Sequence, residues 1–378
     1  MVATRAQRAA AAAPPASVRR ALQSEDVLAC VLSQLDVRDG CLRSVASVSK
    51  AWRAAWRRRC AGRCRLLRTR IGAFEYAVHV TALPGGGGAI VPDYGHFQLE
   101  AFSRDGDAQA IYCERFNTPG AIALLGDGTA WVLARDGNAL CRVRWQDQIG
   151  GEPPSERWPH NFVEDENFGD PYGRILLRVD IRALGWSMNC SLLPYDLAVS
   201  GDRLILLCQG GGSWGIARIC VFDSQTGAFL YHIGEADALR SPMSLAAHQD
   251  LCFVADTYNH VIKIFNFRQR ELVRTIGSTA AFAGLRASDL PCEFTMPSGI
   301  AFQGGRLYVS EARGRRIQIL RFVDGIHGAV ECLQIIQSPN GKHLYGLCVS
   351  GERLWCVGST VSDVPTWKGC LHLFTACV

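Results

Sequence analysis

The chain has 378 residues, 48% of them hydrophobic and 20% charged, with a net charge of +5. This length allows a large core, and these proportions are ordinary for a soluble globular protein. The sequence contains no apolar run of the roughly 20 residues that a membrane-spanning helix needs, so we expect no membrane contact.

Basic residues are concentrated at the start of the chain, and most cysteines lie in predicted strands. Residues 1–75 hold 15 basic and 5 acidic residues, whereas the remainder holds 25 basic and 30 acidic residues and is mildly acidic.

Most of the sixteen cysteines, such as Cys220 and Cys252, lie inside strand patterns, where cysteine acts as a small hydrophobe. Without a secretory h-region we expect reduced thiols and a cytoplasmic and/or nuclear protein. Cys60 and Cys64 lack nearby ligands to complete a zinc site.

The first twenty residues consist mainly of Ala, Arg and Pro and contain no acid. Such low complexity cannot bury enough apolar area to become ordered, so residues 1–20 are expected to be disordered. An Arg-rich, acid-poor start is also typical of an organellar transit peptide, and that alternative stays open.

Residues 21–64 have the pattern of three short helices. Ser24 is a suitable N-cap, and Glu25 and Asp26 follow it in the first turn, where the helix dipole favours negative charge. Three short helices are too small for a core of their own, so an apolar face is expected to contact a partner. The residues expected on that face lie at helical spacing and are Leu22, Val27, Leu28, Val31, Leu32, Leu35, Leu42, Val45, Val48 and Trp52.

This segment resembles the F-box. Residues 22–35 and the run Val-Ser-Lys-Ala-Trp-Arg at residues 48–53 carry the resemblance. The chain departs from the family at Gln23, where a proline is usual, and at residues 40–41, where Gly-Cys replaces Leu-Leu. The resemblance implies docking on the Skp adaptor of a cullin-RING ubiquitin ligase. A helical cap that packs only on the rest of the chain is the alternative.

The remainder of the chain is a repeat, clearest over residues 239–277. Four short runs, at residues 241–246, 251–260, 261–265 and 272–277, are rich in β-branched and aromatic residues, as antiparallel strands are. The same order of runs recurs around residues 193–234 and 294–336. Pro194, Pro242 and Pro297 are spaced by 48 and 55 positions, close to the period of propeller blades.

Three weaker copies bring the number of units to six. One opens at Phe116, one opens at Leu344, and the first of all begins with a strand expected at residues 75–80. The pattern Pro-x-Gly-Ile-Ala, Tyr-Val-x-Glu and Arg-Ile-x-Ile over residues 297–319 resembles the NHL repeat, whose members form six-bladed β-propellers. The resemblance covers roughly residues 66–378. An open β-sandwich is the alternative.

The expected fold is therefore mainly β: a six-bladed, NHL-like β-propeller over residues 65–378, preceded by a small three-helix F-box-like segment. A loop insertion at about residues 145–173 interrupts the repeat, and it is rich in Pro, Gly, acids and aromatics. Long loops of repeat folds often project from the binding face. The candidate target-binding residues are Trp158, Phe162, Phe168 and Tyr172 in this loop, and Arg313, Arg315 and Arg316 in a basic cluster. An insertion without a ligand is equally compatible with the composition.

Acidic residues recur just after the second strand of several units, at Asp93, Asp136, Asp256 and Glu311. Some propeller enzymes hold a metal ion with inward-facing carboxylates, so these residues are candidate ligands. Their recurrence at one blade position favours a simpler role as turn residues that accept backbone N–H bonds. The sequence also lacks a nucleophile elbow, a phosphate loop and a zinc-protease motif. We therefore expect no catalytic residues, no metal and no cofactor.

These patterns predict the substrate-recognition subunit of an SCF-type cullin-RING ubiquitin ligase, with an unknown target protein. Some NHL propellers bind single-stranded RNA on a basic face, which is the main alternative. An RNA face needs cations from several blades, and the acidic balance of residues 76–378 disfavours it. A protein scaffold outside any ligase, or less readily a propeller hydrolase or lyase, stays open.

Closure of the ring is expected to use the start of the repeat region. The last unit supplies three strands, at residues 344–349, 353–357 and 369–374, but no fourth strand. Residues 66–72 read Leu-Leu-Arg-Thr-Arg-Ile-Gly and parallel the fourth strand Leu-Val-Arg-Thr-Ile-Gly at residues 272–277. Because propellers avoid exposed edges, residues near 65–71 are predicted to pair antiparallel with residues 370–374. A continuation of the third F-box helix is the alternative.

Overall fold

The computed structural model describes residues 64–75, 77–96, 98–111, 119–134, 139–144, 175–181, 192–210, 217–234, 237, 239–278, 290–359 and 368–376. The chain divides into two compact units, Met1–Arg63 and Cys64–Val378. The predicted disordered tail and the three predicted helices belong to the first unit and lie outside the described residues. In the part of the chain that the structure describes, no helix is both long and apolar enough to span a membrane.

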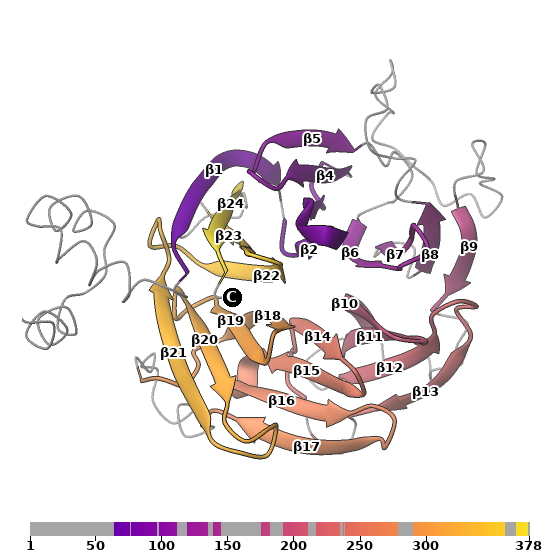
Figure 1. The fold of residues 1–378 in the computed structure, drawn as a ribbon. Coiled ribbons are helices and arrows are strands. Elements are labelled where there is room, and N and C mark those ends of the chain that lie inside the picture. Colours follow the sequence, from indigo (N-terminus) through magenta and orange to yellow (C-terminus); the bar gives the residue numbers. More distant parts are fainter. Residues whose placement is uncertain are drawn as a thin grey trace, which may run out of the picture. The chain divides into compact units, whose positions relative to one another are not determined.

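The second unit consists of six four-stranded antiparallel sheets arranged as a ring of blades (Figure 1). Blade 1 contains β2 (Thr81–Ala82), β3 (Gly88–Asp93), β4 (Gln98–Ser103) and β5 (Ala108–Ile111), and blade 2 contains β6 (Pro119–Leu124), β7 (Thr129–Ala134), β8 (Ala139–Arg144) and β9 (Ile175–Asp180). Blade 3 contains β10 (Leu192–Ser200), β11 (Arg203–Gly210), β12 (Arg218–Asp223) and β13 (Phe229–Ile233), and blade 4 contains β14 (Ser244–His248), β15 (Leu251–Asp256), β16 (Val261–Asn266) and β17 (Glu271–Ile276). Blade 5 contains β18 (Pro297–Gln303), β19 (Arg306–Glu311), β20 (Arg316–Phe322) and β21 (Val330–Gln337), and blade 6 contains β22 (Leu344–Ser350), β23 (Arg353–Ser359), β24 (Lys368–Thr375) and β1 (Leu66–Glu75).

The first strand of each blade lies nearest the centre of the ring and the fourth lies at its outer rim (Figure 1). Short 3-10 helices, η1 (Pro84–Gly86) and η4 (Thr257–Asn259), occupy two of the connections. This arrangement confirms the predicted six-bladed propeller. The first strand of blade 1 was wrongly placed at residues 75–80, because β1 extends to Glu75 and the strand of blade 1 is the short β2.

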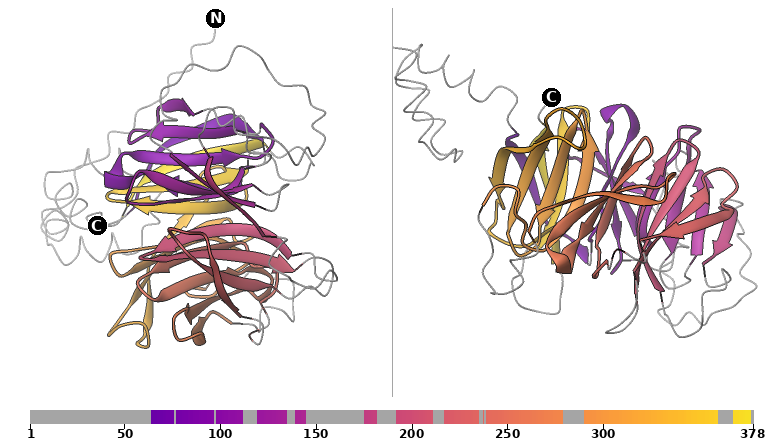
Figure 2. Two further views of the ribbon diagram at one scale, coloured as in Figure 1. Left: turned by 90° about the vertical axis from the view of Figure 1, so that its right-hand side faces the viewer. Right: turned by 90° about the horizontal axis from the view of Figure 1, so that it is seen from below.

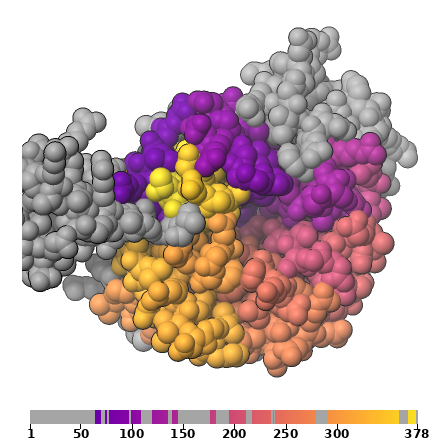
Figure 3. All heavy atoms as spheres, in the orientation of Figure 1, coloured from indigo at the N-terminus to yellow at the C-terminus, as the bar shows by residue number. Residues whose placement is uncertain are grey.

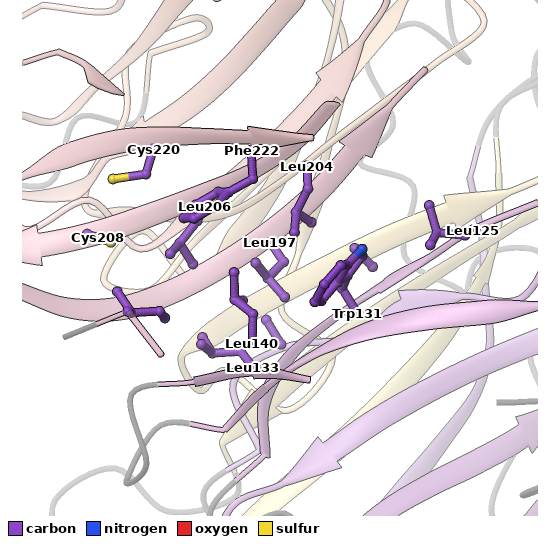
Figure 4. Packing of buried hydrophobic residues seen from close by; sticks show 13 residues of the cluster. Leu125, Trp131, Leu133, Leu140, Leu197, Leu204, Leu206, Cys208, Cys220 and Phe222 are labelled. Atoms are coloured by element: carbon purple, nitrogen blue, oxygen red, sulfur yellow. The ribbon is translucent and has the colours of Figure 1, made fainter. Parts of the chain in front are cut away.

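Apolar residues fill the space between neighbouring sheets, which stack face against face (Figure 2). Between blades 2 and 3, Trp131 and Leu133 of β7 pack in one buried cluster with Leu204 and Leu206 of β11 (Figure 4). The indole Nε1 of Trp131 also donates a 2.8 Å hydrogen bond to the carbonyl oxygen of Ser224. Burying one such leucine side chain stabilises the fold by about 1.5–3 kcal/mol, so these contacts between blades hold the ring together.

The ring closes through a clasp, in which β1 pairs antiparallel with β24 from Leu66 opposite Phe374 to Ile71 opposite Cys370. This pairing confirms the predicted outer strand of the last blade, and the alternative of a helix through residues 66–71 is wrong. In the space-filling view the indigo residues of β1 lie beside the yellow residues of blade 6 (Figure 3). The pairing continues N-terminally, because Arg65 N donates to Thr375 Oγ1 at 2.9 Å and Thr375 N donates to Arg65 O at 2.8 Å.

A buried histidine lies inside the clasp. His372 on β24 is inaccessible to solvent, with its Nδ1 3.0 Å from Thr69 Oγ1 on β1 and its Nε2 3.3 Å from Cys370 Sγ. Burial lowers the pKa of His372 to about 4. The imidazole is therefore neutral near pH 7, which allows it to sit in the apolar interior.

The clasp predicts different outcomes for two truncations. Deletion of residues 1–63 should leave a folded, monodisperse propeller, because every strand remains. Deletion of residues 1–72 should cause unfolding or aggregation, because it bares the edge of β24. Thermal unfolding followed by circular dichroism, with size-exclusion chromatography, measures both. Equal stability of the two truncated proteins would show that β1 does not close the ring.

The second prediction concerns acid sensitivity. Between pH 6.5 and pH 4 the unfolded chain protonates this histidine while the folded chain keeps His372 neutral, so stability should fall with falling pH by about 3 kcal/mol. His372→Gln should remove this part of the slope in urea denaturation, and His327→Gln, at an exposed position, is the control. An unchanged slope in His372→Gln would contradict the assignment.

Candidate protein-interaction surface

Three blades carry a buried carboxylate at the end of their second strand, and we call these residues the strand-end carboxylates: Asp93, Asp256 and Glu311. Each accepts a hydrogen bond from a backbone N–H in the segment that leads into the same blade. The bonds run from Glu75 N to Asp93 Oδ1 at 2.9 Å, from Arg240 N to Asp256 Oδ1 at 2.7 Å and from Thr295 N to Glu311 Oε2 at 2.7 Å. These contacts confirm the predicted turn role. The fourth recurring acid, Asp136, lies outside the described residues.

Donors from the following turn and strand satisfy the remaining oxygens. Asp93 Oδ2 lies 2.7 Å from His96 Nδ1. Asp256 Oδ2 lies 2.8 Å from both Asn259 Nδ2 and Lys263 Nζ. In each case one carboxylate joins the segment before the first strand to the turn after the second strand. The loops at this end of the blades are therefore fixed by charge-assisted hydrogen bonds.

The carboxylate in blade 5 has the most complete set of partners. Glu311 Oε1 accepts hydrogen bonds from Arg316 Nε at 2.7 Å and from Gln318 Nε2 at 2.8 Å. Burial raises the pKa of Glu311, and the hydrogen bonds from these two side chains oppose that rise. The same balance holds at Asp93, whose pKa burial raises and His96 lowers. Removal of a partner would thus leave an uncompensated buried charge.

The structure corrects one of the predicted target-binding residues. Arg316 is only 2% exposed and lies inside blade 5 against Glu311, so it cannot contact a partner. Arg313 and Arg315, in the turn between β19 and β20, are exposed. Strand register is the sequence signal that could have distinguished buried Arg316 from exposed Arg313 and Arg315, because Glu311 and Arg316 lie directly opposite each other in the β19–β20 hairpin.

Other predicted site residues cannot be placed. The predicted adaptor-binding residues Leu22, Val27, Leu28, Val31, Leu32, Leu35, Leu42, Val45, Val48 and Trp52, and the insertion aromatics Trp158, Phe162, Phe168 and Tyr172, lie outside the described residues. The strands that flank the insertion are β8 and β9 of blade 2. Both sets therefore stay predictions.

A buried polar cluster that sequence reasoning missed lies near the centre of the ring. His79 Nδ1, in the segment before β2 of blade 1, lies 3.4 Å from Asp196 Oδ1 on β10 of blade 3. Asp196 Oδ2 accepts hydrogen bonds from Ser244 Oγ and Leu245 N of blade 4, both at 2.8 Å. The His79 ring also lies edge-on to Tyr195, with centroids 5.4 Å apart. These contacts join the inner strands of three blades.

The buried acids of the described residues have roles within the fold. Among them, no group of three or more His, Cys, Asp and Glu side chains could hold a metal ion. The strand-end carboxylates and Asp196 each contact protein donors in place of a ligand. Among the described loops, those beside Asp93, Asp256 and Glu311 are fixed by these contacts.

The F-box domain family matches residues 24–63. This match confirms the resemblance seen at residues 22–53. The matched segment ends at Arg63, and the described part of the second unit begins at Cys64.

Two curated proteins are similar to about half of this chain. Protein SWT21 of Candida glabrata is 22% identical over 213 residues, which is 53% of this chain and 50% of that protein. NHL repeat-containing protein 2 of Gallus gallus is 25% identical over 218 residues, which is 53% of this chain and 28% of that protein. The matches thus span half or less of the length of these relatives. The second supports the predicted NHL resemblance.

Solved structures support the fold. A luciferin-regenerating enzyme superposes with a TM-score of 0.57 at 9% identity, over 82% of this chain and 95% of that one. A gluconolactonase from Xanthomonas campestris superposes with a TM-score of 0.53 at 14% identity, over 82% of this chain and 89% of that one. At these identities the likeness shows a shared propeller fold and carries no activity over.

The buried pair in blade 5 gives the third prediction. Glu311→Ala should destabilise the propeller by about 3–5 kcal/mol, because it leaves Arg316 buried without a counterion. Glu331→Ala removes the partner of Arg321 in the same blade, but that pair is about half exposed on both sides and should matter by less than about 1 kcal/mol. Urea unfolding of the two variants measures the difference. Similar small losses in both would contradict a structural role for Glu311.

Proposed function

We propose that this chain is the substrate-recognition subunit of an SCF-type cullin-RING ubiquitin ligase. In this proposal the F-box docks the Skp adaptor and the propeller binds a target protein. The F-box match at residues 24–63 carries the proposal, together with the propeller that follows it in the same chain. A subunit of this kind works by holding its target at high effective concentration near the transferring enzyme.

The propeller unit begins directly after the matched F-box. The matched F-box ends at residue 63, and the propeller anchors the very next residue through a side-chain amide. Cys64 N donates to Gln334 Oε1 at 2.9 Å, and Gln334 Nε2 donates to Cys64 O at 3.0 Å. The F-box match and the propeller thus cover adjacent, separate parts of the chain.

The proposal treats the propeller as a non-catalytic binding module without a cofactor. The recurring acids of three blades accept hydrogen bonds from the backbone of the segments that lead into those blades, and the proposal gives them this structural role in place of metal binding. The proposal also places the chain in the cytoplasm, the nucleus or both. That location agrees with the free thiols of the ten cysteines in the described part.

Single-stranded RNA is the second candidate ligand of the propeller. Exposed Arg313 and Arg315 favour it, because cations that follow a phosphate backbone are a requirement of such binding. The acidic balance of residues 76–378 disfavours it. A steep loss of affinity with rising salt would separate an RNA complex from recognition of a protein.

The fourth prediction tests the F-box. Leu32→Asp should abolish binding of a purified Skp adaptor to the full chain, because the predicted apolar contact would bury an uncompensated charge. Isothermal titration calorimetry measures the binding. Gln34→Asp, a neighbouring position outside the predicted contact face, is the matched control and should bind normally.

Both variants should keep the unfolding transition of the wild-type propeller. No adaptor binding by the wild type, or undiminished binding by Leu32→Asp, would overturn the proposed docking. Melting of the propeller in Leu32→Asp would instead favour the helical-cap alternative.

A further inference from the structure

The loops at one end of blades 4 and 5 form a single continuous surface. We define the blade 4–5 surface by Arg240, by the η4 turn with Tyr258 and His260, by residues 295–296, and by Arg313 and Arg315. Hydrogen bonds connect these segments. Four join backbone groups: Tyr258 N donates to Arg240 O at 3.1 Å, Ala312 N to Met296 O at 2.9 Å, Gly314 N to Thr295 O at 3.1 Å and Ser338 N to Arg315 O at 2.8 Å. In the fifth, Met296 N donates to the side-chain Nδ1 of His260 at 3.1 Å. The surface is therefore held in one shape before any partner binds.

Two buried acids hold the backbone of this surface in place. Asp256 holds the backbone of Arg240, and Glu311 holds the backbone of Thr295. The negative charges lie inside, where Lys263 and Arg316 compensate them. Arg313 and Arg315, in the turn between β19 and β20, are exposed.

The exposed charge of the surface is positive. Arg240, Arg313 and Arg315 are all exposed. Within the described ranges, Arg313 and Arg315 form no ion pair with a carboxylate. The pKa of His260 is lowered first by burial and then by the charges of Arg313 and Arg240, which agrees with their lying around the same side chain. Two separate segments thus bring three arginines to this end of the blades.

Apolar side chains accompany these cations. Tyr258 is 47% exposed within the surface, and Leu290, at the start of the segment that leads into blade 5, is 61% exposed. The carbonyl oxygen of Leu290 accepts a hydrogen bond from Arg316 Nη2 at 3.3 Å, which ties that segment to the same blade. Exposed apolar groups on the same blades as exposed arginines are typical of a protein-binding surface.

We propose that the blade 4–5 surface binds an acidic segment of a partner protein that also carries apolar side chains. Arginine suits this role, because its planar guanidinium binds a carboxylate through two parallel hydrogen bonds. The proposal rests on the proposed receptor function and deepens it by naming the chemistry of the target. One exposed ion pair is weak, so binding requires several arginines together with contacts to Tyr258 and Leu290.

A peptide fits these features better than RNA does. A single-stranded RNA needs a row of cations along its backbone and several aromatic side chains on which bases stack. Among its described residues the surface offers one exposed aromatic ring, that of Tyr258, and its three arginines lie on two adjacent blades. Exposed Leu290, at the start of the segment that leads into blade 5, can be covered by an apolar side chain of a peptide.

The test uses the full chain and a fluorescein-labelled synthetic peptide in which Glu alternates with Leu and Phe. A second peptide has Gln in place of every Glu. Fluorescence polarisation should show binding of the acidic peptide and about tenfold or greater weakening with the Gln peptide. The double variant Arg313→Glu/Arg315→Glu should lose affinity for the acidic peptide by a similar factor. Arg178→Glu, at an exposed position of the outer strand β9, is the matched control and should bind as the wild type does.

The variant Tyr258→Ala removes an exposed aromatic ring without changing the charge of the surface. It should also weaken binding of the acidic peptide. Equal binding of the acidic and Gln peptides, full affinity in the double variant, or equal loss in Arg178→Glu would overturn the proposal. Tighter binding of a single-stranded oligouridylate, lost in the same double variant, would overturn it in favour of RNA.

Adaptor binding measured on the same preparations separates the two proposals. Retained adaptor binding without peptide binding would leave the receptor function standing and refute only the acidic-segment proposal. Peptide binding without adaptor binding would support the acidic-segment surface and refute the receptor function.

Discussion

The propeller depends on the pairing of its first strand with its last. Without β1, blade 6 would have three strands and an open edge at β24, and an open edge is a site of aggregation. The seam beside this clasp is reinforced by ion pairs between blades 6 and 1, in which Arg68 lies 2.7 Å from Asp107 and Arg104 lies 3.1 Å from Glu352. These pairs are exposed and individually weak. The backbone pairing is therefore the main constraint that turns six sheets into a ring.

Side-chain hydrogen bonds fix both the start of the propeller and the loops of the blade 4–5 surface. The residue that follows the matched F-box is held by Gln334 of blade 5, and the next one pairs with Thr375 at the end of β24. In blades 4 and 5, the strand-end carboxylates Asp256 and Glu311 hold the loops that carry Arg240, Arg313 and Arg315. A mildly acidic propeller can carry a basic surface because some of its acids are buried as structural groups while these arginines face outward.

Sequence reasoning succeeded where a feature repeats and failed where it does not. The clasp could be predicted because residues 66–72 carry the pattern of a fourth strand, and the role of Asp256 and Glu311 followed from their recurrence. The burial of Arg316 was missed because neighbouring arginines were taken as one group, although strand alternation turns Arg316 inward. The contact of His79 with Asp196 joins blades 1 and 3, and nothing local in the sequence indicates so distant a pair.

The most direct test of the account is whether one chain binds adaptor and target at the same time. Size-exclusion chromatography with light scattering, applied to the full chain with a purified Skp adaptor and the fluorescein-labelled acidic peptide, measures this. The account predicts a complex with the mass of one chain and one adaptor, with the peptide co-eluting. Absence of the adaptor complex, or release of the peptide when the adaptor binds, would contradict it.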